Sequence, residues 1–167
     1  MKNTIVIADT GAIISLIVID KLWIVEKIFT EVYIANEVWI ELQKYSKGNE
    51  EFRQSLSYLN NKVKNSKRDE NLESLLDDGE NESIGLYKEL NADYIIIEDK
   101  KARTIATGLG VNCIGVLTIL EKAKELKLID SLRGIFILFL KNKRYYSKDL
   151  LNYVLERNGE ERISDYK

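Results

Sequence analysis

Two aspartates stand directly after apolar, β-branched runs of the kind that form buried strands. Asp9 follows "TIVIA" (residues 4–8), and Asp99 closes "DYIIIED" (93–99). In a parallel α/β sheet, a residue just past the carboxyl end of a strand faces the ligand-binding crevice. We therefore expect both carboxylates at one edge of a sheet, where they could bind a cation. Aspartate is also a preferred helix N-cap, so capping of the following helix is the alternative for each residue.

The residues around Asp9, "DTGA" (9–12), are also typical of the loop that carries the catalytic carboxylate of aspartic proteases. That fold is all-β, and its Asp-Thr-Gly lies in a loop between strands. Here a helical pattern follows Gly11, and strands alternate with helices along the chain. The sequence therefore argues against a protease.

A third candidate acid lies on the helix expected over residues 79–90. At about 100° per residue, this helix has one apolar face. The face consists of Ile84, Leu86, Tyr87 and Leu90. Glu80 falls within it, where a carboxylate is costly unless a cation or donor meets it, so Glu80 is the better ligand candidate. Glu82 falls roughly opposite, toward solvent, and is expected to complete a capping box with Gly79 as N-cap.

Glu41 is the fourth candidate, at the border of the apolar face of the helix expected over residues 36–45, with Asn36 as its N-cap. The alternative for Glu41 is an ordinary surface glutamate. Four acids converging at one sheet edge would form a site for a hard cation such as Mg²⁺ or Mn²⁺. Two such cations about 3.5–4 Å apart activate water and stabilise the leaving oxygen of a phosphodiester. The chain contains no histidine, which excludes Ser-His-Asp and Cys-His catalysis and histidine metal sites.

Strands that alternate with helices must position these acids. Strands are expected at residues 4–8, 31–35, 93–99 and 111–116, and residues 60–71 are expected to be a mobile loop or a sheet edge. The pattern predicts an α/β fold with a central parallel sheet of about four to five strands, covered by helices on both faces. We expect a single domain over residues 1–167, with an α/β core at 1–128 and a helical C-terminal tail at 129–167.

The composition is that of an ordinary water-soluble protein, with 45% hydrophobic residues, 31% charged residues and a net charge of −2. This balance gives no overall attraction for polyanions, so a polyanion would have to meet a local basic cluster. Three such clusters are Lys62/Lys64/Lys67/Arg68, Lys100/Lys101/Arg103 and Lys141/Lys143/Arg144. The single cysteine, Cys113, is expected to be a buried hydrophobic residue. No signal peptide and no membrane span is expected, so a cytoplasmic location is predicted.

The ordered set of motifs resembles a PIN domain, most closely a PIN-like family related to VapC toxins, and covers nearly the whole chain. "IVIADTGAIISL" resembles the first strand and acidic turn, and "VYIANEVWIEL" resembles the segment with the second acid, with Ala35 where the family usually has proline. The most specific match, "LDDGENESIGLYKELNADYIIIEDKKAR", resembles a Gly-Glu-x-Glu helix, a strand and then Asp-Asp-x-x-Ala-Arg. Lys100 is taken as the second residue of that Asp pair, so only Asp99 carries over.

The resemblance implies a PIN-like three-layer α/β/α fold and a ribonuclease that depends on Mg²⁺ or Mn²⁺. The implied catalytic residues and metal ligands are Asp9, Glu41, Glu80 and Asp99. The implied supporting residues are Thr10, which would position Asp9 or water, Glu82, and Arg103. Arg103 would hold a phosphate or brace the acids, and its alternative is an ion pair with Asp99.

The resemblance also implies partners. Lys100, Lys101 and Arg103 are candidates for binding an RNA substrate, and many relatives are toxins held by a small antitoxin protein. The oligomeric state is left open, and a homodimer is one alternative.

Two other interpretations of the function remain. One is a non-catalytic binding module that kept the fold, because Lys100 beside the acids would weaken metal binding. The other is a structure-selective DNA nuclease that uses the same acids.

Overall fold

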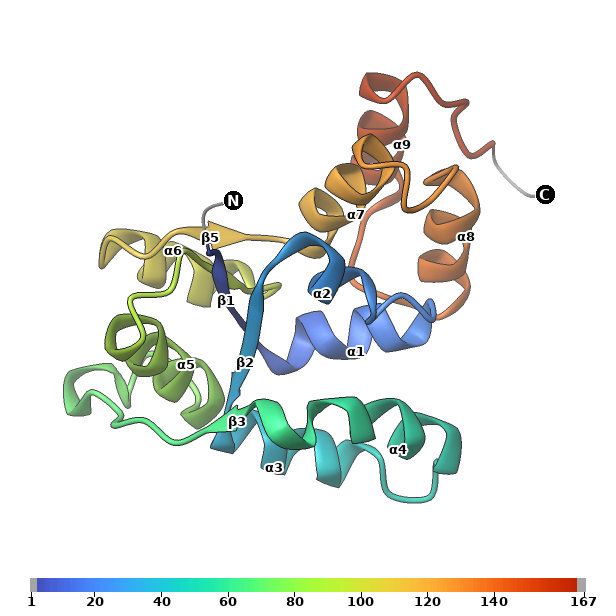
Figure 1. The fold of residues 1–167 in the computed structure, drawn as a ribbon. Helices are drawn as coiled ribbons and strands as arrows, with labels where there is room; N and C mark the ends of the chain where they lie inside the picture. Colours follow the sequence, from blue (N-terminus) through green and yellow to red (C-terminus); the bar gives the residue numbers. More distant parts are fainter. Residues whose placement is uncertain (1–2, 165–167) are drawn as a thin grey trace.

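A five-stranded parallel sheet forms the centre of the molecule, seen in a computed structural model that describes residues 3–164. The strands are β1 (Ile5–Ala8), β2 (Glu31–Ala35), β3 (Val63–Lys64), β4 (Tyr94–Ile96) and β5 (Cys113–Ile114). They lie in the order β3-β2-β1-β4-β5, and each neighbouring pair is parallel. The predicted α/β fold with a parallel sheet of four to five strands is confirmed (Figure 1).

Helices connect the strands and continue beyond the last one. Before β4 they are α1 (Thr10–Val18), α2 (Ile24–Ile28), α3 (Asn36–Tyr45), α4 (Glu50–Leu56) and α5 (Asp78–Glu89). After β4 come α6 (Lys100–Gly108), α7 (Val116–Glu125), α8 (Arg133–Lys141) and α9 (Lys148–Arg157). In Figure 1, α5 and α6 lie on one side of the sheet and α1 and α2 on the other. α3 contacts both α1 and α5, so it joins the two layers near the carboxyl end of β2.

The central strands are apolar throughout because helices cover both faces of the sheet. Val6 and Ile7 of β1 and Ile95 and Ile96 of β4 are completely buried. The register pairs Ile7 with Ile95, and the next residue of each strand is paired in turn. The two strands therefore end level with each other, and the turns that follow them lie side by side.

Two local expectations change in detail. The N-cap position of α3 is Ala35, which makes no side-chain capping bond, and Asn36 is already the first helical residue. Asn36 is therefore not the N-cap. Of the two alternatives for residues 60–71, the sheet edge is the one observed, because β3 pairs with β2 through Val63 and Ile34. Two short 3₁₀ turns, Ser57–Lys62 and Glu70–Leu72, flank that edge strand.

The helices α7, α8 and α9 stand together at one end of the molecule (Figure 1). Glu160, just after α9, ties them together, because its carboxylate accepts the backbone N–H of Leu132 at 2.8 Å and pairs with Lys124 at 2.7 Å. Partial burial by itself raises the pKa of Glu160, but these donors outweigh it and lower the pKa to about 2. Within residues 3–164, no helix combines the length and the apolar character needed to cross a membrane.

Candidate functional site

A cleft of about 970 Å³ opens at the carboxyl ends of the strands. Its walls come from the turns after β1 and β4, from α3, from the starts of α5 and α7, and from the chain between α8 and the end of α9. The acids that line it are Asp9, Glu41, Asp77, Glu80, Glu98 and Asp99. The four acids expected from the sequence therefore lie around one cleft, together with two more.

Asp9 lies at the base of the cleft and has only 5% of its surface exposed. It is the N-cap of α1: Oδ1 accepts the N–H of Ala12 at 2.8 Å, and Oδ2 accepts the N–H of Glu98 at 3.4 Å. The pKa of Asp9 is raised to about 7, and burial is the largest cause of this change. The hydrogen bond from the Ala12 N–H acts in the opposite direction and lowers the pKa. The charges of Glu98 and Glu80 raise it further. Asp9 therefore both caps α1 and faces the cleft.

Glu41 reaches the cleft from α3 and is held by Thr10. The Thr10 hydroxyl donates to Glu41 Oε2, so Thr10 positions Glu41 rather than Asp9. Burial raises the pKa of Glu41, and the Thr10 hydrogen bond opposes this change. A Cβ built on Gly79 would lie 2.8 Å from Glu41 Oε1. The start of α5 can therefore approach Glu41 this closely only because Gly79 has no side chain.

Glu80 lies in the cleft at the first turn of α5. The helix begins at Asp78 with Asp77 as N-cap, two residues before the expected cap, and Glu80 completes the capping box. Asp77 Oδ1 accepts the Glu80 N–H at 2.7 Å, and Glu80 Oε2 accepts the Asp77 N–H at 3.2 Å. Burial and then the charge of Asp77 raise the pKa of Glu80 to about 7, with smaller contributions from Asp99 and Glu41. Glu80 is therefore a carboxylate that a cation would stabilise.

Glu82 does not face solvent, and that expectation is wrong. Only 5% of its surface is exposed, because α3 and the chain after β3 fold over this side of α5. Its Oε2 accepts the N–H of Glu37 at 2.7 Å, and its Oε1 accepts the N–H of Ser66 at 3.0 Å. Two backbone donors make the buried carboxylate tolerable. Glu82 is outside the residues that line the cleft, and the expected capping box belongs to Glu80 instead.

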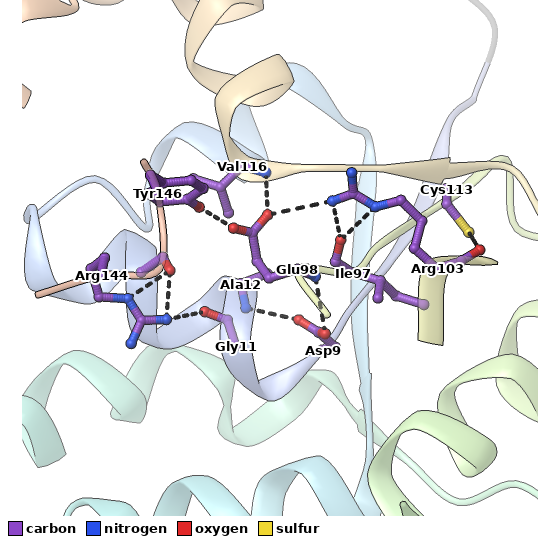
Figure 2. Close-up of polar contacts among 11 residues, drawn as sticks. Asp9, Gly11, Ala12, Ile97, Glu98, Arg103, Cys113, Val116, Arg144 and Tyr146 are labelled. Carbon is purple, nitrogen blue, oxygen red and sulfur yellow. Dashed lines mark hydrogen bonds and ion pairs between the residues drawn. The ribbon is translucent and has the colours of Figure 1, made fainter. Parts of the chain in front are cut away.

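Glu98, which the sequence analysis did not select, is the acid beside Asp9 (Figure 2). Because β1 and β4 end level, the Asp9 N–H donates to the carbonyl of Ile96 at 3.1 Å, and Glu98 follows two residues later. Glu98 Oε1 accepts the N–H of Val116 at 2.7 Å, and Oε2 accepts the hydroxyl of Tyr146. Three segments far apart in the sequence thus meet at one carboxylate.

Asp99 lies at the exposed rim of the cleft. It is the N-cap of α6, and its Oδ1 accepts the N–H of Ala102 at 2.8 Å.

A signal for Glu98 was present in the motif itself. Counted back from Ala102-Arg103, the acidic pair of Asp-Asp-x-x-Ala-Arg falls on Glu98 and Asp99. Lys100 is then the first variable position, so the expectation that it replaces the second aspartate is corrected.

Arg103 braces Glu98 rather than pairing with Asp99. Its Nε and Nη2 donate to the carbonyl of Ile97 at 3.2 and 2.6 Å, and its Nη2 lies 3.9 Å from Glu98 Oε1 (Figure 2). Lys100 lines the cleft at its exposed rim, whereas Lys101 is not among the lining residues. Of the three basic side chains expected to bind substrate, two therefore line the cleft.

The donor set fits a hard divalent cation by its chemistry. The acids offer only carboxylate oxygens, and Asp9, Glu41 and Glu80 all have pKa values raised first by burial. Within residues 3–164, no three acids or cysteines are grouped closely enough to hold one ion together. Mg²⁺ commonly uses one or two carboxylates and keeps several waters, so it does not require a three-carboxylate group.

Comparisons with known proteins identify a family for this chain. A family model described as a PIN domain matches residues 5–160, which include every acid of the cleft. The comparison with curated proteins gave no match. Among solved structures, a PilT N-terminus domain protein from the hyperthermophilic archaeon Sulfolobus solfataricus is similar, with 21% identity and a TM-score of 0.49. The similarity covers 72% of this chain and 93% of that chain.

Proposed function

Because the chain belongs to the PIN-domain family, we propose that it is a metal-dependent nuclease, and specifically an endoribonuclease that hydrolyses phosphodiester bonds of RNA. One observation carries the proposal: Asp9, Glu41 and Glu80 line the same cleft with raised pKa values. Acids that repel one another and are partly withdrawn from water are stabilised in their charged form by a cation. A cation held there could assist the hydrolysis of a phosphate ester.

The residues of the chain have distinct roles in this proposal. Asp9, Glu41, Glu80 and Asp99 would hold Mg²⁺ or Mn²⁺, which when bound supplies an activated water and neutralises charge on the phosphate. Thr10 holds the Glu41 carboxylate by its Oε2. Because protons and a cation would compete for the same carboxylates, a bound cation would favour the charged forms of Asp9 and Glu80.

Glu98 and its contacts would keep the turn after β4 in place beside Asp9. Arg103, Tyr146 and the N–H of Val116 all meet this one carboxylate. Glu98 therefore contributes negative charge next to Asp9 while its own orientation is fixed. We assign Arg103 a positioning role, because its guanidinium is already engaged by Glu98 and by the Ile97 carbonyl.

The test is cleavage of single-stranded RNA with Mg²⁺ or Mn²⁺ and its loss in EDTA. Asp9→Asn should lower the rate by at least about 10²-fold, because it removes a ligand and its charge. Glu51→Gln is the matched control, since Glu51 is an exposed acid on α4 outside the cleft and should leave the rate unchanged. Equal rates for Asp9→Asn and wild type would place the activity elsewhere or in a contaminant. The same assay on single-stranded and branched DNA separates a ribonuclease from a structure-selective DNA nuclease.

A non-catalytic binding module is the second candidate, because the acids of the described chain are not grouped around one ion position. It predicts nucleic-acid binding without cleavage at any Mg²⁺ or Mn²⁺ concentration.

Regulation by a small antitoxin protein is a further part of our proposal. Induced expression of the wild type should then arrest growth, Asp9→Asn should not, and coexpression of the antitoxin should relieve the arrest.

A further inference from the structure

The C-terminal part of the chain forms a wall of the cleft that contains both aromatic and basic side chains. Tyr145, between α8 and α9, is 95% exposed, and Tyr153 on α9 is 59% exposed. A guanidinium lies over each ring: Arg144 is 5.5 Å from the Tyr145 centroid and Arg157 is 5.4 Å from the Tyr153 centroid. All four residues line the same cleft as the acids. We call these four residues the Tyr-Arg wall.

Arg144 is fixed in the cleft by neutral groups alone. Its Nε and Nη2 donate to the Ser15 hydroxyl at 3.1 and 2.8 Å, and Nη2 also donates to the Gly11 carbonyl at 3.2 Å (Figure 2). Within residues 3–164 no carboxylate forms a salt bridge with it. A guanidinium has five N–H donors, so both donors on Nη1 remain for another partner. Because Gly11 is two residues from Asp9, this positive charge lies next to the acidic site.

The other two arginines of the cleft, Arg103 and Arg157, are engaged differently. Arg103 is held by the Ile97 carbonyl and lies near Glu98. Arg157 pairs with Glu121 through a hydrogen bond of 2.6 Å from Nε, yet 47% of its side chain is still exposed. Arg144 is therefore the group on this wall best prepared to meet an anion, and Arg157 is a weaker second one.

Local sequence explains why the aromatic rings face the cleft. Leu150, Tyr153 and Arg157 recur at intervals of three and four residues, so they share one face of α9. All three line the cleft, while Leu151 and Leu155 on another face are buried in the core. An aromatic ring exposed as fully as that of Tyr145 gains almost nothing from folding. Its contact surface is available to a ligand.

We propose that the Tyr-Arg wall binds a single-stranded segment of the nucleic acid, with bases stacked on Tyr145 and Tyr153 and a phosphate on Arg144. This inference rests on the proposed function, and it names the residues that would present the strand to the acids. Aromatic rings accept any base by stacking, and a guanidinium matches the geometry of phosphate oxygens. Bases within a duplex are stacked on one another and cannot reach the rings, so the wall selects unpaired strands.

The test measures binding separately from cleavage. The probe is a labelled single-stranded RNA of about 12 nucleotides, titrated in EDTA at low salt and followed by fluorescence anisotropy. Tyr145→Ala and Tyr153→Ala should each weaken binding by about 5- to 100-fold, and Tyr145→Phe should retain it, because stacking needs only the ring. Arg144→Gln should weaken binding and reduce its dependence on salt.

Two controls match these changes outside the cleft. Tyr45→Ala removes a ring that is 55% exposed on α3, and Arg53→Gln removes an arginine on α4. Both should bind RNA like wild type. A strand of the same length without bases should bind wild type, Tyr145→Ala and Tyr153→Ala equally, because only the stacking contribution is absent. Thermal melts that match wild type show that the exposed substitutions leave the fold intact.

The outcomes separate this inference from the proposed function. Binding that depends on the tyrosines, without cleavage in Mn²⁺, supports the wall and overturns the nuclease. Cleavage together with unchanged binding by all three wall variants overturns the wall and leaves the nuclease standing. Equal binding of duplex and single strand, or no binding by the wild type, also overturns the wall. A protein partner that covers Tyr145 and Tyr153 while RNA binding ignores them would assign this surface to that partner instead.

Discussion

The carboxylate of Glu82 on α5 caps the first turn of α3 by accepting the backbone N–H of Glu37 at 2.7 Å. The N-cap residue of α3 provides no side-chain capping bond of its own. A negative charge at this position also interacts favourably with the helix dipole. Since α3 carries Glu41, a buried acid outside the cleft helps to position an acid inside it.

Glu80→Gln and Glu82→Gln should therefore fail in different ways. Glu82→Gln replaces a charged acceptor of two buried N–H groups, so we expect a loss of about 1–3 kcal/mol in the free energy of unfolding. Glu80→Gln retains an acceptor for the Asp77 N–H and removes a carboxylate with a raised pKa, so stability in EDTA at pH 7 should be equal to or higher than that of wild type while nuclease activity is lost. Denaturant unfolding and RNA cleavage, measured on both proteins, check this. The reverse pattern would show that Glu82 is the functional acid.

Gly79→Ala should displace Glu41 without unfolding the protein. The new Cβ would lie 2.8 Å from Glu41 Oε1, and the flexible end of that side chain can move aside. Moving it breaks the hydrogen bond from Thr10. We expect activity to fall by about tenfold or more, as for other losses of ligand orientation, with little change in melting temperature.

Gly108→Ala on α6 is the control for that substitution, because nothing lies within 4 Å of its Cβ position. It should leave activity unchanged and should not destabilise the helix. If Gly79→Ala cleaves RNA as fast as Gly108→Ala, the position of Glu41 does not matter for the reaction.

The stability of the metal-free protein should depend on pH through Asp9. Its pKa is raised from 3.8 to about 7 in the folded chain. Between these values the folded state holds a proton that the unfolded state has lost, so stability falls as pH rises through this window. Asp9→Asn removes this loss and keeps an acceptor for the Ala12 N–H. In EDTA the variant should be more stable than wild type at pH 8, on the order of 1–3 kcal/mol, with no advantage near pH 4.

Unfolding in denaturant at a series of pH values measures this difference. An advantage that is the same at every pH would show that packing rather than ionisation causes it. A variant less stable than wild type at pH 8 would mean that the ionised carboxylate is favourable in the fold. The same series on Glu51→Gln, which removes an exposed carboxylate of α4 outside the cleft, is the control.

Tyr146→Phe should reduce activity through Glu98. The substitution removes the hydroxyl that donates to Glu98 Oε2 and keeps the ring that packs on Phe139 at 4.8 Å between centroids. Stability should fall by about 1–3 kcal/mol, as for the loss of one hydrogen bond to a carboxylate. Tyr33→Phe is a matched control, because Tyr33 also donates to a glutamate, Glu31, outside the cleft. Kinetics in which both variants lose activity equally would rule out a specific role for the Glu98 contact.

The sequence predicts the sheet well because parallel strands covered on both faces are continuously apolar. The runs that end at Asp9 and Asp99 give β1 and β4 directly. Two such strands in one sheet are enough to expect their terminal acids at one edge. The position of Glu41 also follows from the helical pattern after β2, since α3 covers residues 36–45 and differs from the expectation only in its N-cap, which is Ala35 rather than Asn36.

Sequence patterns do not reveal positions that tertiary contacts decide. Helical phase placed Glu82 in solvent, but phase does not reveal that the backbone of Ser66 folds over that face. Glu98 is a different case, because the acidic pair counted back from Ala102-Arg103 falls on Glu98 and Asp99, so its signal lies in the sequence. Arg144 lies more than 130 positions from Gly11, so no local pattern predicts that the two meet.

The dependence of the cleft on Arg144 and Tyr146 also sets an order of events during synthesis. Domains emerge from the ribosome with their N-terminal part first. The strands β1 to β5 and all the acids of the cleft precede residue 116, whereas the side chains that reach Gly11 and Glu98 come from residues 144 and 146. A nascent chain therefore carries the acids while its cleft still lacks a wall. A cleft built in this way is completed only after residues 144 and 146 have been synthesised and have folded back onto Gly11 and Glu98.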